Sequence, residues 1–294
     1  MLTLDRVSKT YRTGTFGGKQ LPAVRDVSFA VRPGEVVSLI GESGSGKSTI
    51  GRMVLRLTRP TAGVVALDGI DVSTLERGEL KAYYRRVQGV FQDPFSSYNP
   101  IFKADRVFSV VKDGFFPRVP RGEWEAKVEE ALEAVSLNPG DCLRKYPHQL
   151  SGGQLQRLLV ARALLLDIEL LVADEIISML DASTRIDVLN LLGDLKSRGL
   201  GILFITHDLS LGNYLSDRTV ILRRGQIVEM GATERVFGNP LHSYTRMLLA
   251  SVPKLDRKWG DEPWPTGDAT QVSRDARELL EVEEDHLVAT EEAQ

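Results

Sequence analysis

The 294-residue sequence lacks several features that would place it in whole classes of protein. It has one cysteine, Cys142, which excludes an internal disulfide and metal binding by a cluster of thiolates. No segment comes near the roughly 20 consecutive apolar residues that a membrane-spanning helix needs. The N-terminal segment MLTLDRVSKTYRTG has no apolar stretch after a basic one, as a secretion signal would. We therefore expect a protein that stays in the cytosol.

The sequence also lacks a strong charge of either sign. Its net charge is −3, and the acidic excess is concentrated in residues 260–294, so the preceding part is mildly basic. No basic stripe with interleaved aromatic residues is present, and nucleic acid is therefore not expected as a partner. Hydrophobic residues make up 42% and charged residues 26%, close to the average for soluble globular proteins.

Short apolar runs alternate with helical periodicity, which predicts an α/β protein with a largely parallel sheet covered on both faces. The expected strands are 27–31, 36–40, 87–91, 170–173, 202–205 and 220–222. A helix is expected from Lys47 to about Leu57. Between Asp93 and His148 the pattern becomes helical, including residues 124–135, and predicts a helical insertion.

The C-terminal part divides into two segments. After Gly231, a short segment carries apolar residues that can form one face of a helix, among them Val236, Phe237, Tyr244, Met247 and Leu248. Beyond Lys258 the composition is acidic and includes two prolines, which predicts disorder. Within that tail, residues 276–287 (ARELLEVEEDHL) are compatible with a marginal helix.

A glycine-rich segment follows the second predicted strand and opens the first predicted helix, as the phosphate-loop pattern G-x-x-x-x-G-K-[ST] requires. Its residues are Gly41, Glu42, Ser43, Gly44, Ser45, Gly46, Lys47, Ser48 and Thr49. The glycines let successive N–H groups point inward at the positive end of the helix, where they bind phosphate. Lys47 would reach the β- and γ-phosphates of ATP, and the Ser48 hydroxyl would bind Mg²⁺. A plain glycine turn would need neither side chain.

Two acids end the apolar strand at 170–173. Asp174 is suited to hold Mg²⁺, mostly through water, and Glu175 to act as the general base on the attacking water. An acidic pair after a strand is by itself more often a helix N-cap than a catalytic site. The phosphate loop upstream favours catalysis here.

The segment Leu150-Ser151-Gly152-Gly153-Gln154 precedes the acidic strand by roughly 20 residues and resembles the signature motif of ABC ATPases. The resemblance implies that two cassettes face head to tail. The signature of one cassette then caps the γ-phosphate held by the phosphate loop of the other. Ser151 offers a hydroxyl, and Gly152 and Gly153 leave N–H groups unobstructed at the start of a helix.

Four further positions resemble ABC ATPase motifs, although each has a plain alternative when it stands alone. Tyr11 is similar to the aromatic residue that stacks on adenine, and Gln92 to the glutamine that senses Mg²⁺ and couples to the membrane subunits. His207 is similar to the switch histidine at the γ-phosphate. Asp181 matches the loop through which the cassettes sense each other. The alternatives are core packing for the tyrosine, a solvated turn for the glutamine, and helix capping or a surface position for the histidine.

The sequence departs from the family after Glu175, where Ile176 and Ile177 replace the usual proline and small polar residue. Because β-branched residues favour extended backbone, we expect the strand to run slightly past Glu175. ATP hydrolysis is nevertheless expected, since Glu175, His207 and the signature are intact.

The resemblance covers about residues 1–255 and implies an ABC-type phosphate-loop core with an antiparallel β subdomain, a helical subdomain and a short C-terminal extension. The expected boundaries are 1–92 with 155–231 for the core, 93–154 for the helical subdomain with the signature, 232–257 for the extension and 258–294 for a disordered tail.

Two segments narrow the resemblance to ATPase subunits of oligopeptide and dipeptide importers: Phe91-Gln92-Asp93-Pro94 with Ser97-Tyr98-Asn99-Pro100, and Asn239 to Thr245 with Leu248 to Pro253. This subgroup implies a heterodimer with a second ATPase, two permeases, an extracytoplasmic binding protein, and a place at the cytoplasmic face of the membrane. Oligosaccharides and nickel chelates remain alternative cargoes.

Two other kinds of ABC protein fit the sequence less well. A soluble ABC ATPase is disfavoured because the chain has neither a long coiled coil nor a second cassette. A regulatory subunit that binds ATP without turnover is disfavoured by Glu175 and His207.

The segment PFSSYNPIF after Gln92 presents aromatic and aliphatic groups that can receive a helix of the permease. The alternative is that Phe95, Tyr98 and Phe102 pack the helical insertion against the core.

Overall fold

A computed structural model describes residues 1–13, 18–178, 180–251 and 279–289. By its internal contacts the chain divides into two compact units. Unit 1 combines residues 1–74 with 203–294, and unit 2 is residues 75–202. None of the helices in the described ranges is both long and apolar enough to span a bilayer.

Unit 1 contains an antiparallel sheet of four strands in the order β2-β1-β4-β5. The strands are β1 (Leu2–Thr13), β2 (Lys19–Val31), β4 (Ala62–Leu67) and β5 (Ile70–Asp71). Val27, Phe29 and Val31 of β2 are buried in alternation with more exposed residues. This period of two places one face of the sheet in the core and confirms the strand expected at 27–31.

The second set of strands in unit 1 positions the phosphate loop. Its order is β11-β12-β10-β9-β3-β8, of which β8 belongs to this unit from Leu203. The strands are β3 (Val36–Ile40), β8 (Gly201–Thr206), β9 (Arg218–Arg223), β10 (Gln226–Ala232), β11 (Leu279–Glu283) and β12 (His286–Ala289). Strand β3 pairs in parallel with β9, and all of its residues are buried, as the continuous apolar run predicted.

The described residues of unit 1 contain four helices. They are α1 (Lys47–Val54), α8 (Leu209–Leu215), α9 (Thr233–Gly238) and α10 (Ser243–Ala250). The expected helix after the phosphate loop is therefore present and ends three residues earlier than predicted. Val236 of α9 and Tyr244 of α10 are buried in one core cluster, against which Phe237, Met247 and Leu248 pack. The apolar face predicted for this segment is thus confirmed.

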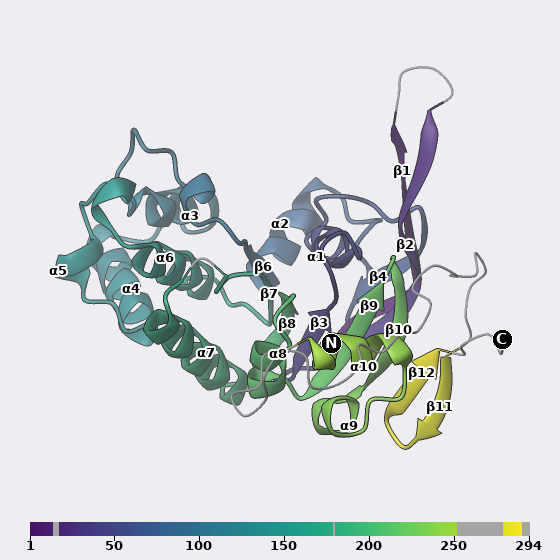
Figure 1. Cartoon of the computed structure of the whole chain (residues 1–294). Coiled ribbons are helices and arrows are strands. Elements are labelled where there is room, and N and C mark those ends of the chain that lie inside the picture. The colour runs from purple at the N-terminus through teal and green to yellow at the C-terminus, as the bar shows by residue number, and fades with distance from the viewer. Residues whose placement is uncertain (14–17, 179, 252–278, 290–294) are drawn as a thin grey trace. The chain divides into compact units, whose positions relative to one another are not determined.

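The expectation of a disordered tail is wrong for residues 279–289, and so is the alternative of a marginal helix. These residues form the hairpin β11–β12, whose second strand pairs antiparallel with β10 (Figure 1). His286 and Ala289 are buried. The free edge of β10 supplies backbone partners and burial that the acidic composition alone does not reveal. The rest of the predicted tail, 258–278 and 290–294, lies outside the described residues.

Unit 2 carries the parallel strands β6 (Val87–Val90) and β7 (Leu170–Asp174) together with most of the helices. The α-helices are α2 (Arg77–Arg86), α3 (Arg106–Phe115), α4 (Arg121–Ala134), α5 (Pro139–Cys142), α6 (Gly152–Leu164) and α7 (Ala182–Ser197). Short 3₁₀ turns occur at Phe95–Ser97 and Pro147–Gln149.

The predicted helical segment from Asp93 to His148 contains α3, α4 and α5. Helices α3 and α4 pack on α6, and α4 buries Trp124, Val128 and Leu132, which recur at helical spacing. The boundary of a separate helical subdomain at 93–154 stays a prediction, because unit 2 also includes β6, β7 and α7.

Candidate nucleotide-binding site

The phosphate loop leaves the buried strand β3 and enters α1 at Gly46, the residue before the helix. Gly46 has φ +107°, and a Cβ there would lie 2.4 Å from the carbonyl oxygen of Ala23. A Cβ on Gly41 would lie 2.1 Å from the carbonyl oxygen of Leu222. Neither position has room for a side chain, so both glycines are required by the close approach of backbones.

Lys47 lies across this loop and is buried. Its Nζ donates hydrogen bonds to the carbonyl oxygens of Gly41 at 2.7 Å and Glu42 at 2.8 Å. Ser48 and Thr49 follow in the first turn of α1, where backbone N–H groups have no partner within the helix. The loop therefore gathers an ammonium group, hydroxyls and the positive end of a helix, which together suit a phosphate group.

Two other predicted site residues belong to unit 1. His207 is exposed directly after β8, and the helix cap there is Asp208, which accepts hydrogen bonds from the N–H groups of Ser210 and Leu211. The N-cap of α8 is thus Asp208, and the exposure of His207 agrees with its alternative as a surface residue. Tyr11 is half-buried on β1 with the Lys9 ammonium 5.2 Å from its ring centroid. Their roles at the γ-phosphate and the adenine stay predictions.

In unit 2, Gln92 and the two acids end neighbouring strands. Val90 of β6 pairs with Ala173 of the parallel strand β7. Because parallel strands end at the same edge of a sheet, this register places Gln92 level with Asp174 and Glu175. Asp174 is buried and Glu175 half-buried.

The strand does not run past Glu175 as expected. Strand β7 ends at Asp174, Glu175 has φ +50°, and Ile176 and Ile177 lie in a turn closed by a hydrogen bond from Ser178 N to Glu175 O at 3.1 Å. Both isoleucines are about 1% exposed. Their apolar side chains are satisfied by burial in the turn rather than by extended backbone, so tertiary packing overrides the β preference. A left-handed conformation at a non-glycine residue is strained and often marks a functional position.

The signature motif begins α6. Ser151 is the N-cap, and its Oγ accepts a hydrogen bond from Gln154 N at 3.2 Å, while Gln154 Oε1 accepts one from Ser151 N at 2.9 Å. This reciprocal capping box fixes the start of the helix. The resemblance predicts a nucleotide role for Ser151 and Gln154 and does not predict this capping pair, which the spacing S-x-x-Q indicates.

Asp181 caps the next helix, α7. Its carboxylate accepts hydrogen bonds from Ser183 Oγ at 2.6 Å, Thr184 N at 3.0 Å and Thr184 Oγ1 at 2.8 Å. These bonds, the Ser183 hydroxyl first, hold the pKa of the Asp181 carboxyl well below its usual range.

The two helix starts are in contact. A Cβ on Gly153 would lie 2.3 Å from Cγ2 of Thr184. The structure therefore brings the signature next to the Asp181 loop, a contact that motif matching did not predict.

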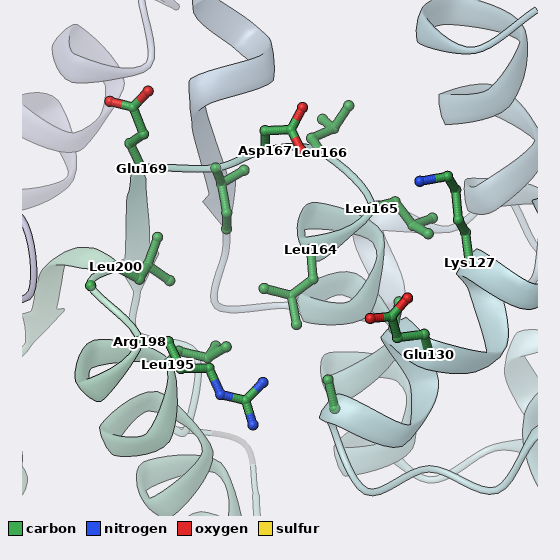
Figure 2. Close-up of a pocket in the computed structure, with 14 residues that line it drawn as sticks. Lys127, Glu130, Leu164, Leu165, Leu166, Asp167, Glu169, Leu195, Arg198 and Leu200 are labelled. Atoms are coloured by element: carbon green, nitrogen blue, oxygen red, sulfur yellow. The ribbon is translucent and has the colours of Figure 1, made fainter.

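A hollow of about 530 Å³ lies elsewhere in unit 2 (Figure 2). Its lining includes Leu164 to Glu169, Leu195 and Leu200. The Asp167 and Glu169 carboxylates are bound by Arg85 at 2.8 Å and Arg86 at 2.6 Å. None of the predicted nucleotide-binding residues lines this hollow, and we therefore do not assign the nucleotide site to it.

A buried strand that leads through a glycine loop with Lys47 and Ser48 into a helix defines a phosphate-loop nucleotide-binding protein. The family model for ABC transporters matches residues 24–178, and the model for the C-terminal region of oligopeptide/dipeptide transporters matches residues 228–276. The chain belongs to the family of ABC transporter ATP-binding proteins, and it is an ATPase of that family. The resemblance inferred from the motifs and the predicted fold class are both confirmed.

Relatives and solved structures agree with this assignment. A putative peptide import ATP-binding protein of Brucella ovis is 43% identical over 259 residues, covering 87% of this chain and 80% of the relative. The glutathione import ATP-binding protein of Salmonella typhi is 43% identical over 249 residues, covering 83% of this chain and 40% of the relative. A dimeric ATP-binding cassette in a post-hydrolysis state with ADP and Pi has TM-score 0.71 and 30% identity, covering 79% of this chain and 99% of that one.

Proposed function

We propose that this chain powers an ABC importer of oligopeptides or dipeptides from the cytoplasmic face of the membrane. The observation that carries the proposal is the pairing, in one chain, of a cassette with a segment that matches the oligopeptide/dipeptide transporter C-terminal region at 228–276. The names of the Brucella and Salmonella relatives, a putative peptide importer and a glutathione importer, support the same cargo class. The partners are a second, different ATPase chain, two permeases and, indirectly, an extracytoplasmic binding protein.

In the proposed reaction, Lys47 and the N–H groups of the phosphate loop hold the β- and γ-phosphates of ATP. Glu175 takes a proton from the attacking water, and His207 orients that water against the γ-phosphate. Ser151 and Gly152 of the partner cassette would close the site from the other side, because one cassette supplies only part of the required placement.

Mg²⁺ would be held by Ser48, Gln92 and Asp174. Oxygen donors are the ligands that Mg²⁺ prefers, and the β6–β7 register places Gln92 and Asp174 at one edge. When bound, Mg²⁺ neutralises charge on the transferring phosphoryl group. The protein's own part is to keep Asp174 buried at the end of β7.

Reconstitution tests the cargo. We expect peptides presented by the cognate binding protein to stimulate ATP hydrolysis by the complete transporter in proteoliposomes and to accumulate inside. Oligosaccharides and nickel chelates, offered in the same assay with the same binding protein, should do neither. Stimulation by one of these instead would keep the importer and replace the peptide cargo. Hydrolysis without any membrane partner or transport would favour a soluble ABC ATPase.

The contact with the permease is proposed at the segment after Gln92. Tyr98 does not belong to that surface, since it is buried and its hydroxyl donates to Leu155 O at 3.0 Å. For Tyr98 the packing alternative therefore holds. Phe95, Ile101 and Phe102 are 49%, 77% and 40% exposed, which supports docking of an apolar helix at these side chains.

Replacing Phe102 by alanine tests this surface. We expect Phe102→Ala to lower peptide uptake per ATP hydrolysed by about threefold, as loss of a partly buried aromatic anchor at an interface would. ATP affinity should not change. Ile186→Ala, which removes an exposed apolar side chain from α7 in the same unit, is the matched control. An unaltered coupling ratio in Phe102→Ala would count against the docking surface.

A further inference from the structure

The C-terminal segment reaches the phosphate loop through Tyr244 on α10. The side chain is buried in the core cluster with Ile40 and Ile221, and its hydroxyl oxygen accepts a hydrogen bond from Glu42 N at 3.2 Å. The guanidinium of Arg223 lies 4.8 Å from the ring centroid. A residue 202 positions away therefore holds the second residue of the loop.

Both backbone polar groups of Glu42 form hydrogen bonds. Its N–H donates to Tyr244, and its carbonyl oxygen accepts from Lys47 Nζ at 2.8 Å. The direction of the Glu42 backbone thus decides where the Lys47 ammonium is anchored. Burial raises the pKa of the Tyr244 phenol, and the oxygen accepts this bond as part of a neutral hydroxyl.

Tyr244 is itself fixed by a buried polar network. His242, the N-cap of α10, accepts a hydrogen bond from Tyr244 N at its Nδ1, 3.0 Å away. The carboxylate of Glu229 on β10 accepts from Leu241 N at 2.8 Å and His242 N at 3.0 Å, and it bonds to Nε2 of His286 on β12 at 2.8 Å. A carboxylate buried at this depth is retained only with several donors, so the turn before α10 is tightly specified.

The packing of the Tyr244 ring does not explain why this residue carries a hydroxyl group. A phenylalanine would fill the same space among Ile40, Ile221 and Val228. What the hydroxyl adds is a directed bond to the loop backbone. Direction, rather than burial, is the property on which a phosphate-binding loop depends, because its N–H groups act only when aimed at the anion.

We propose that Tyr244 is a positioning residue for ATP binding, so that the C-terminal segment sets the geometry of the phosphate loop in addition to marking the kind of transporter. Glu229 acts through Tyr244 by fixing the turn at Leu241 and His242. This inference rests on ATP binding at the phosphate loop.

The test measures binding of a fluorescent ATP analogue with Mg²⁺ to the full-length chain. We expect Tyr244→Phe to raise the dissociation constant about fivefold, the effect of one lost hydrogen bond. Tyr83→Phe, which removes the hydroxyl of a buried tyrosine on α2, should leave the dissociation constant unchanged. If both variants have the same thermal midpoint, the change in affinity belongs to the loop and not to general stability.

Two further variants separate the possible failures. Lys47→Ala must weaken binding; if it does not, ATP is not held at this loop and the proposed site itself is wrong. If Lys47→Ala weakens binding while Tyr244→Phe does not, only the positioning role is overturned. Glu229→Gln is expected to weaken binding, and the double variant with Tyr244→Phe should bind no worse than Tyr244→Phe alone. Additive losses would contradict the action of Glu229 through Tyr244.

Discussion

Glu175→Gln is expected to slow ATP hydrolysis by the assembled transporter at least about a hundredfold, because the amide keeps the shape of the side chain but cannot accept a proton from the attacking water. ATP binding should persist, since the phosphate loop is untouched. Glu175 follows buried Asp174 directly after β7 and has a strained backbone, with φ +50°. Phosphate release from the reconstituted complex measures the loss.

The matched control is Glu169→Gln, one residue before the same strand. Glu169 forms a partly exposed, bidentate ion pair with Arg86 at 2.6 Å, at the opposite end of β7 from Glu175. Hydrolysis should therefore be normal in Glu169→Gln. Full turnover in Glu175→Gln would instead favour a regulatory subunit that binds ATP while another chain hydrolyses it.

The parts of this fold that sequence predicts well are those in which local pattern and tertiary position agree. Strands β3 and β8 are continuous apolar runs because both are buried throughout. The glycine loop after β3 ends in a lysine and a serine, and this combination serves to bind phosphate. The capping box at Ser151 follows the local spacing S-x-x-Q, but it was not predicted because the resemblance assigned both residues to the nucleotide.

The turn after Glu175 could not be predicted in this way. Ile176 and Ile177 carry the composition of a strand, yet burial satisfies them in a turn. Burial of an apolar pair and extension of the backbone are separate requirements, and a short sequence window does not distinguish them.

The hairpin β11–β12 was hidden for a different reason. It lies within an acidic tail that includes two prolines, a composition typical of disorder. Its order comes from the edge of β10, where Glu229 pairs with Val288, and from the buried bond between His286 and Glu229. Glu229 lies 57 residues before His286 in the sequence, so no local pattern contains both residues.

The contact between Gly153 and Thr184 is also beyond local pattern, and it leads to a second large effect. Gly153→Ala is expected to lower the free energy of unfolding by about 1–3 kcal/mol, as overpacking at a close contact does. The new Cβ would lie 2.3 Å from Thr184 Cγ2. Thr184 cannot simply rotate away, because its N–H and hydroxyl both donate to Asp181. Denaturant unfolding of the full-length chain measures the cost.

The same substitution should reduce ATP hydrolysis by the assembled complex at least about tenfold, since a displacement of 1 Å among positioned groups can cost a hundredfold in rate. Either α6 or α7 must shift at its first turn, and those turns carry Ser151 and Asp181. Gly152→Ala is the control for stability, because its Cβ would have nothing nearer than 3.9 Å.

Adding Thr184→Ser to Gly153→Ala tests whether the collision with Thr184 causes these losses. Serine keeps the hydroxyl bonded to Asp181 and removes Cγ2, after which the nearest atoms of residue 184 would lie 3.5 Å from the Cβ on residue 153. The double variant should therefore recover most of the stability and the hydrolysis that Gly153→Ala loses. If the double variant is as impaired as Gly153→Ala alone, the collision with Thr184 is not the reason that a glycine stands at this position.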